Sequence, residues 1–570
     1  MADFFRSFLP LENPLGFGAA DFLELFLAGL LVAAALLWRP RVEPWFRKLA
    51  ARPVWSAALL AVLPVALRLF LLPHHPVPTP DVYDEFSHLL AADTLRHFRL
   101  ANPALPLHQF FETFFVLQQP TYSSIYPLGQ GLFLALGWSL FGYPWAGVLL
   151  AAAAFCPLCY WMLRGWTSPA WALAGAFLAV MEFGPLCSWM NTYWGGMPAA
   201  AAGCLVFGAL PRLLSGRRRD AVLLGLGLAF HLLTRPYESI FLFLAVAAFF
   251  LPFLRRRAAW PALREAAAVA ACIVMPALAL TAAQNKQVTG SWTTLPYTLS
   301  QYQYGVPTSL TVQPNPVPHS GLTPQQQMDY RMQTSFRPAN GETILTFLER
   351  LEYRVRYYRF YFLPPLYFAL LASLVLMREY RFAWVACTLA LFALGTNLFP
   401  AFQLHYIAAV ACLFVLLSVA GLARISRWSL RGQPVGLEIA AILFLLCASH
   451  FLFWYGVHLF EPSALSQDLR SYETWDAINH ANPERRIAVS QQLARLTGNV
   501  LVFVRYAPRH IFQEEWVWNA ADPAESRVVW VRDLGDTANR QLLTAFPGRQ
   551  PLLFEPDAIP MRITPYQPAP

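Results

Sequence analysis

Residues 54–103 decide the architecture of this chain. They read VWSAALLAVLPVALRLFLLP (54–73), followed directly by HHPVPTPDVYDEFSHLLAADTLRHFRLANP (74–103). The first part is an apolar run of about 20 residues, the length that a helix needs to cross a bilayer. The second part turns abruptly to acids and histidines. This order predicts a membrane-spanning helix that delivers a chemically active loop to one face of the membrane.

Comparable apolar runs recur through most of the 570 residues. Apolar residues make up 57% of the chain and charged residues only 13%, whereas globular chains carry about 25% charged residues. The aromatic content of 15% excludes a disordered chain, because that class is poor in aromatics and rich in charge. A single soluble domain is excluded by the repeated apolar runs. We therefore predict an all-α polytopic membrane bundle of about twelve transmembrane helices.

The charge of the short loops predicts which side of the membrane each loop occupies. Loops at alternate ends of the spans are rich in arginine, for example at 217–219 and 255–257, and an excess of Lys and Arg marks cytoplasmic loops. The net charge of +9 is thus a topology signal and indicates no nucleic-acid partner. The predicted spans are roughly 22–38, 54–73, 145–163, 168–188, 194–211, 220–234, 237–254, 265–283, 359–377, 382–399, 404–423 and 437–457.

One further segment, LGQGLFLALGWSLFG (128–142), is apolar enough to be a span. Counting it would move the later arginine-rich loops outside, so we interpret it as a helix lying at the outer membrane surface. The twelve spans then place both termini on the extracytoplasmic side, and the N-terminal residues lack the pattern of a signal peptide. All eight cysteines fall within predicted spans, so no disulfide framework is expected in the outer loops.

Three regions outside the spans are predicted to share the extracytoplasmic face. They are 74–144, 284–358 and the tail 458–570, which follows the transmembrane domain at 1–457. The tail alternates helical and strand patterns, with strands expected at 499–506 and 527–533, and so predicts a small α/β domain. It contains no glycine-rich phosphate loop or nucleophile elbow, and an accessory role is favoured.

The first outer loop holds the residues best suited to chemistry. On a helix that begins after Pro80, Asp81, Asp84 and His88 would share a face, with Glu85 beside them. Acids in the first turn of a helix are also common as dipole partners, which is the alternative interpretation. A divalent metal held by Asp81, Asp84 and His88 is a second alternative.

Other motifs bring cations and aromatic side chains to the outer ends of predicted spans. Such a set around an anionic carboxylate suits a phosphate-bearing lipid and a sugar, because the cations can bind phosphate and aromatic faces can stack on the sugar ring. Each Arg or Tyr taken alone is more often an interface anchor. The candidate substrate-binding residues are Asp81, His88, Tyr126, Tyr193, Arg235, Lys286, Tyr297, Arg354, Arg356, Arg359, His405 and Tyr406.

Over roughly 54–425 the pattern resembles the GT-C superfamily of membrane glycosyltransferases, nearest to the protein O-mannosyltransferase and aminoarabinose lipid A transferase branch. The resemblance rests on the Asp84-Glu85 pair in the first outer loop and on the short motifs Tyr126-Pro127, Thr234-Arg235-Pro236 and His405-Tyr406. The chain departs from that branch by one extra span at its start and by Arg235 where a lysine is expected. The resemblance implies Asp84 as the catalytic carboxylate, with Glu85 beside it. It also implies a polyprenyl-phosphate-linked sugar donor, inversion at the anomeric carbon and, often, no essential metal.

The leading functional hypothesis is a multi-pass glycosyltransferase of the inner (plasma) membrane. It would move a hexosyl or pentosyl group to a lipid, glycan or protein acceptor, with Asp84 as general base and with Arg235, Lys286 and Arg356 offsetting phosphate charge. No cofactor is required, although a divalent metal stays an alternative. The rival hypotheses are a twelve-span transporter or lipid flippase, which needs polar groups near the bilayer midplane, and a membrane scaffold.

Overall fold

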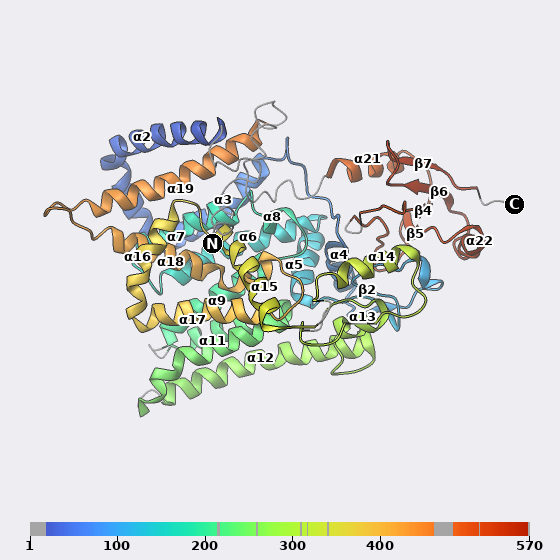
Figure 1. The fold of residues 1–570 in the computed structure, drawn as a ribbon, viewed down its shortest axis with the longest axis horizontal. Coiled ribbons are helices and arrows are strands. Elements are labelled where there is room, and N and C mark those ends of the chain that lie inside the picture. Colours follow the sequence, from blue (N-terminus) through green and yellow to red (C-terminus); the bar gives the residue numbers. More distant parts are fainter. Residues whose placement is uncertain are drawn as a thin grey trace.

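The computed structural model describes residues 19–213, 217–257, 260–307, 310–315, 317–338, 341–460, 483–511 and 514–567. Most of them are helical, and the helices of the bundle run roughly along one common direction (Figure 1). A small mixed sheet lies at one end of that bundle, at the right of Figure 1.

Every predicted span coincides with helical structure. Six helical segments are long and apolar enough to cross a membrane, judged by length and composition, and the bent helix α2 would be a seventh. The other bundle helices are shorter, so the number of twelve spans stays a prediction. The elements are α2 (Ala19–Ala50), α3 (Pro53–Phe70), α6 (Trp145–Leu163), α7 (Pro169–Phe183), α9 (Met197–Leu213), α10 (Arg218–Thr234), α11 (Pro236–Leu254), α12 (Trp260–Thr289), α16 (Leu366–Ser373), η4 (Leu374–Arg378), α17 (Tyr380–Thr396), η5 (Leu404–Val410), α18 (Ala411–Ile425) and α19 (Gly436–Leu459).

The core of the bundle surrounds α18, whose residues are almost all buried. Small residues let neighbouring backbones approach closely, as is usual between helices in membranes. A side chain at Gly203 of α9, for example, would place its Cβ 1.8 Å from the carbonyl oxygen of Ala409. All eight cysteines are free, as expected for cysteines used as small packing residues.

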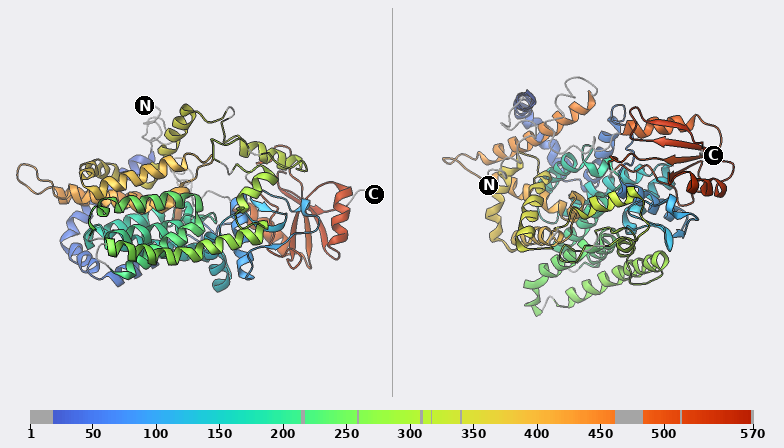
Figure 2. Two further views of the ribbon diagram at one scale, coloured as in Figure 1. Left: turned by 90° about the horizontal axis from the view of Figure 1, so that it is seen from below. Right: turned by 45° about the vertical axis from the view of Figure 1, so that its right-hand side comes forward.

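Most of the elements in the three regions lie toward the end of the bundle that carries the sheet, whereas the helix at Ile344–Tyr357 lies over the middle of the bundle in the left view of Figure 2. The turns that join α11 to α12 and α18 to α19 lie at the opposite end, at the left of Figure 1. The first two regions and the short connections near the site contain α4 (Tyr83–Arg96), β1 (Asn102–Pro103), η1 (His108–Phe110), β2 (Val116–Leu117), β3 (Thr121–Ser124), α5 (Leu128–Phe141), α8 (Ser188–Asn191), α13 (Pro296–Tyr304), α14 (Pro324–Thr334), α15 (Ile344–Tyr357) and η3 (Tyr358–Tyr361).

The C-terminal region forms the α/β structure that its sequence predicts. The sheet has the order β5-β4-β6-β7, in which β5, β4 and β6 are parallel and β7 is antiparallel to β6. One face packs beneath α21, and the other packs against α22 and against Phe110 and Phe111 of the first outer loop. The elements are α21 (Pro483–Ala494), β4 (Val500–Val504), β5 (Val528–Arg532), α22 (Asp536–Ala545), β6 (Gln550–Glu555) and β7 (Arg562–Pro565).

Polar contacts fix this C-terminal region against α4. The backbone N–H of Glu515 donates to the carbonyl oxygen of Asp81 at 2.9 Å, and the N–H of Ala521 donates to Asp93 at 2.8 Å. The guanidinium of Arg486 lies over the rings of Phe86 and Trp516. Both ends of α4 are therefore held by the C-terminal region, which orients the helix that carries Asp84.

Candidate functional site

Helix α4 begins at Tyr83, two residues later than the sequence suggested, and this start decides the roles of its acids. Glu85 occupies the third helical position, and its Oε2 accepts the N–H groups of Asp81 at 2.9 Å and Val82 at 3.4 Å. This is the usual position from which a glutamate caps a helix start. The other oxygen, Oε1, accepts the backbone N–H of Tyr193 at 2.9 Å. Glu85 thus holds the backbone at the start of α4 and the backbone at Tyr193 in place. It lines neither of the two cavities that are described below.

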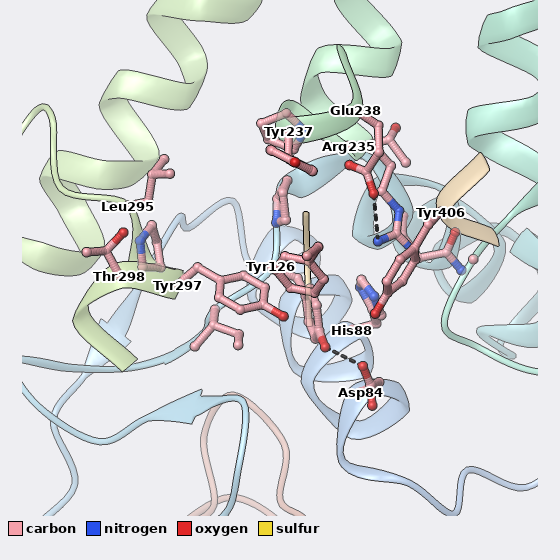
Figure 3. Close-up of a pocket in the computed structure, with 18 of the residues that line it drawn as sticks. Asp84, His88, Tyr126, Arg235, Tyr237, Glu238, Leu295, Tyr297, Thr298 and Tyr406 are labelled. Atoms are coloured by element: carbon pink, nitrogen blue, oxygen red, sulfur yellow. Dashed lines mark hydrogen bonds and ion pairs between the residues drawn. The ribbon is translucent and has the colours of Figure 1, made fainter. Parts of the chain in front are cut away.

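Asp84, one residue earlier, faces an open space. Its Oδ1 accepts a hydrogen bond from the Tyr126 hydroxyl, and the Tyr126 ring stacks on His88 with centroids 4.1 Å apart (Figure 3). Burial raises the pKa of Asp84 above its ordinary value, while the bond from Tyr126 and the charge of Arg235 oppose that rise. Burial also lowers the pKa of His88 to about 3, so its ring is neutral near pH 7.

The first cavity, which we call the Arg235 cavity, has a volume of about 380 Å³. It lies where α4, the start of α5, the junction of α10 and α11, the end of α12, α13 and η5 meet. Seven predicted site residues line it: Asp84, His88, Tyr126, Arg235, Tyr297, His405 and Tyr406. The structure therefore unites residues that lie more than 300 positions apart in the sequence.

Arg235 supplies the cation of this cavity. Its guanidinium lies 4.8 Å from the centroid of the Tyr406 ring, and its Nη1 lies 3.9 Å from Oε1 of Glu238. Figure 3 shows this ion pair on the side of the cavity opposite Tyr297. The preceding residue, Thr234, packs so closely on α5 that a Cβ at Gly129 would lie 2.2 Å from its hydroxyl oxygen. Glycine at 129 therefore allows the contact that places Arg235.

Three residues that line the Arg235 cavity each have a buried polar atom without a hydrogen-bond partner among the described residues. These atoms are His88 Nδ1, Gln130 Oε1 and Asn285 Oδ1. An unsatisfied buried polar group costs about 1–3 kcal/mol, and native proteins satisfy nearly all such groups. The wall of the cavity therefore contains polar side chains that can hydrogen-bond a ligand, and some of their buried atoms are unsatisfied among the described residues.

A second cavity, which we call the Tyr357 cavity, has a volume of about 540 Å³ and lies between α4, α14, α15 and the segment at 399–404. Asp84, Trp194, Tyr297, Phe399 and Tyr406 line both cavities. The predicted residue Arg354 also lines the Tyr357 cavity. Its guanidinium donates to the carbonyl oxygens of Thr396, Phe399 and Pro400 at 2.7–2.8 Å.

Besides Glu85, four predicted site residues line neither cavity. Asp81 precedes α4 and interacts with charges of the C-terminal region, so the expected shared face of Asp81, Asp84 and His88 is wrong. The Tyr193 hydroxyl donates to the Pro78 carbonyl oxygen at 2.7 Å. Lys286 donates to the Gly290 carbonyl oxygen at 2.7 Å, and Arg356 pairs with Glu352 at 2.7 Å. The side chain of Arg359 lies outside the described residues.

No metal site is formed by three or more His, Cys, Asp or Glu side chains in the part of the chain that the structure describes. The three residues considered for a metal do not converge, because Asp81 points toward the C-terminal region. Asp84 and His88 are both engaged with Tyr126.

Sequence reasoning missed several polar residues of the Arg235 cavity. Glu238 and Gln130 each lie a few residues after a motif that was recognised, and Gln284 and Asn285 directly precede Lys286. Amides and acids at the outer ends of apolar helices were the available signal. The positive charge of Lys286 made it the predicted residue in this segment. Its uncharged neighbours Gln284 and Asn285 are the residues that line the cavity.

The sequence matches no protein-family model and no curated protein. Among solved structures, the chain is similar to ArnT from Cupriavidus metallidurans bound to undecaprenyl phosphate. The likeness has 14% sequence identity and a TM-score of 0.50, and it covers 86% of this chain and 92% of that chain. This likeness shows that the chain shares the fold of ArnT.

This fold is the one that the sequence resemblance implied. A second similar structure is the oligosaccharyltransferase AglB from Archaeoglobus fulgidus in complex with an inhibitory peptide and a dolichol-phosphate. It has 12% identity and a TM-score of 0.38, covering 90% of this chain and 70% of that chain, and at that score the likeness supports no conclusion.

Proposed function

We propose that this protein is a multi-pass glycosyltransferase of the inner membrane. It transfers a sugar from a polyprenyl-phosphate donor to an acceptor outside the cytoplasm. The observation that carries the proposal is the convergence of Asp84 and Arg235 with the polar side chains of His88, Gln130 and Asn285 around one cavity. A GT-C protein of similar fold, ArnT, has been solved with undecaprenyl phosphate bound, which supports this donor class.

The residues of the Arg235 cavity suit a phosphate next to a sugar. Arg235 can donate charge-assisted hydrogen bonds to the phosphate and offset the negative charge that grows on it as the sugar departs. The lining also includes Gln130, Asn285 and His88, whose side chains can hydrogen-bond sugar hydroxyls. The aromatic rings of Tyr126 and Tyr297 lie edge to face, 5.8 Å apart, and offer apolar surface to a sugar ring.

Asp84 then acts as the general base. The acceptor oxygen attacks the anomeric carbon while its proton passes to the Asp84 carboxylate. The bond between that carbon and the phosphate oxygen breaks, and its electron pair leaves with the polyprenyl phosphate. Attack from the face opposite the leaving group inverts the anomeric centre. Burial raises the pKa of Asp84 and so makes it a stronger base than an exposed aspartate.

We further propose that this end of the bundle faces outward and that the reaction requires no cofactor. The arginine-rich loops at the other end support the orientation. The rival hypothesis of a transporter or flippase draws no support from the cavities described, because their polar groups lie at the outer helix ends. The transferred sugar is a hexosyl or a pentosyl group.

The experiment is a transfer assay with the purified protein in lipid nanodiscs. A radiolabelled sugar is supplied either on a polyprenyl phosphate or on a nucleotide, with cell-envelope lipids and glycans as acceptors. Label should move only from the polyprenyl-phosphate donor, and the product linkage should be inverted by NMR. Transfer from the nucleotide donor alone would contradict the proposal, as would a retained anomeric configuration.

A further inference from the structure

The two cavities meet at Asp84, but they differ in charge. The charged residues that line the Tyr357 cavity are Asp84, Arg350 and Arg354 among the described residues. The Arg350 guanidinium pairs with Glu342 at 2.7 Å, and its Nε donates to the Asn397 carbonyl oxygen at 2.9 Å. Both charges of that pair are largely withdrawn from solvent, with 12% and 8% of their side chains exposed.

The second cation, Arg354, hydrogen-bonds to backbone groups of the protein. Its two terminal nitrogens donate to three carbonyl oxygens of the turn at 396–400, and the residue is 3% exposed. Its remaining face lies over the Phe402 ring, with 5.4 Å between the guanidinium carbon and the ring centroid. Among the described residues, the Tyr357 cavity therefore has no cation that resembles Arg235, whose guanidinium donates no hydrogen bond to the described part of the chain and whose side chain is 18% exposed.

Aromatic side chains supply most of the remaining wall. The hydroxyls of Tyr353 and Tyr357 are 2.7 Å apart, and the Tyr357 ring also neighbours Phe402. Phe115, Phe336, Phe399 and Tyr406 complete an aromatic lining, and Gln333 and Gln403 add amide groups. Flat apolar faces with a few neutral hydrogen-bonding groups suit an uncharged ring that carries hydroxyls, whereas a phosphate would be desolvated without compensation.

We propose that the Tyr357 cavity binds the acceptor, and that the acceptor is an uncharged carbohydrate presenting a sugar hydroxyl to Asp84. This proposal rests on the proposed function. The bond formed joins the acceptor hydroxyl oxygen to the anomeric carbon of the donor sugar. The hydroxyl proton goes to Asp84, and the polyprenyl phosphate leaves with the electron pair of the broken bond. An acceptor that carries phosphate at this position is disfavoured because Asp84 repels it and Glu342 neutralises Arg350.

The experiment compares two probes that differ by one phosphate: hexyl β-D-glucopyranoside and its 6-phosphate. Binding to the protein in nanodiscs is measured by calorimetry with the Arg235 cavity saturated by undecaprenyl phosphate, and sugar transfer onto each probe is measured with the polyprenyl-phosphate donor. The neutral glucoside should bind at least about tenfold more tightly, the effect of roughly one uncompensated charge contact. Equal or tighter binding of the 6-phosphate would overturn the proposal.

Glu342→Gln sharpens this comparison because it removes the negative charge that neutralises Arg350, while Glu342 itself does not line the cavity. Affinity for the 6-phosphate should rise by about tenfold while affinity for the neutral glucoside stays the same. Thermal stability and polyprenyl-phosphate binding are measured on the same sample to confirm that it is folded. An unchanged preference in a folded Glu342→Gln protein would overturn the charge argument.

Tyr357→Ala tests the aromatic wall, and Tyr302→Ala is its matched control. Tyr302 belongs to the same outer loop but is 73% exposed and lines neither cavity. Tyr357→Ala should weaken binding of the neutral glucoside about tenfold or more and leave donor affinity unchanged, while Tyr302→Ala should change neither. Equal effects of the two substitutions would contradict the site.

The proposed function and this proposal fail in different ways. Sugar transfer that runs onto the 6-phosphate but not onto the neutral glucoside would uphold the glycosyltransferase and overturn the neutral acceptor. Binding of the neutral glucoside that depends on Tyr357, in a protein that transfers sugar from no polyprenyl donor, would uphold the binding site and overturn the proposed function.

Discussion

Two carboxylates, the half-buried Asp84 and the fully buried Glu515, lie on either side of the start of α4 and differ in how many hydrogen bonds they accept. Glu515 is fully buried and all its acceptor capacity is used. Asp84 is bonded to one side chain and otherwise faces two cavities. The donors to Glu515 are the side chains of Thr113, Tyr506 and Arg532 and the backbone N–H groups of Trp516 and Val517.

This difference separates a structural acid from a reactive one. A buried carboxylate that collects several donors is stabilised as the anion and holds the surrounding segments together. A half-buried carboxylate with a single side-chain donor keeps acceptor capacity for a proton. The C-terminal region, which contains Glu515, therefore holds α4 in place. On the cavity side of α4, Asp84 can still accept a proton.

The largest effect is expected from Asp84→Asn. Asparagine keeps the shape of the side chain but cannot take up the acceptor proton, so turnover should fall by about 10²–10⁴-fold. Donor binding should change little. The measurement is sugar transfer at saturating donor, with Asp81→Asn as the control because Asp81 faces the C-terminal region. If Asp84 were only a helix N-terminal acid, the substitution would cost about 0.3–1 kcal/mol of stability and leave activity intact.

Removing the partner of Glu515 should damage stability. Arg532 and Glu515 form an ion pair of 3.2 Å with side chains 3% and 0% exposed. Arg532→Ala leaves a buried unpaired charge, which typically costs about 3–5 kcal/mol. Arg562→Ala, which breaks an ion pair with 62% of the arginine side chain exposed, should cost about 0–1 kcal/mol. The measurement is the free energy of unfolding of each variant in detergent. Equal losses for Arg532→Ala and Arg562→Ala would contradict this account.

Arg235→Ala should weaken binding of polyprenyl phosphate by about 1.5–3 kcal/mol, since it removes charge-assisted hydrogen bonds to the phosphate. Arg356→Ala, predicted from the sequence to act alike, should have little effect because Arg356 lies outside both cavities and pairs with Glu352. Equilibrium binding of radiolabelled undecaprenyl phosphate distinguishes the two. A larger loss for Arg356→Ala would place the phosphate elsewhere.

The smallest effect expected is a shift in pH dependence. Burial raises the pKa of Asp84 and the charge of Arg235 opposes it. Because the base must be ionised, kcat/KM should fall as pH decreases through a pKa above the ordinary aspartate value of about 3.9. Residual activity of Arg235→Ala should show this acid limb at still higher pH, since the opposing charge is gone. A limb that moves to lower pH would contradict the assignment.

Much of the fold could be predicted from the sequence, because the length of an apolar run predicts where a bundle helix forms. The helices at all twelve predicted spans and the strands near 500 and 528 follow from such local patterns. The docking of the C-terminal sheet onto Phe110 and Phe111 could not be predicted. That contact depends on long-range packing between segments about 400 residues apart.

The candidate site was predictable only in part, for a related reason. Asp84, Tyr126, Arg235 and His405 stand at helix ends that the topology brings together. The roles of Glu85 and Arg354 were not predictable, because both are spent on backbone groups that only the folded chain presents. The presence of charge at a helix end does not tell whether that charge faces a ligand or the chain itself.

The most direct test is a cryo-EM structure of the protein with a bound polyprenyl-phosphate sugar. The account predicts that the phosphate lies within hydrogen-bond distance of the Arg235 guanidinium and that the sugar extends toward Asp84, with its anomeric carbon open to the Tyr357 cavity. A phosphate bound beside Lys286 or Arg356, with no sugar density next to Asp84, would contradict it.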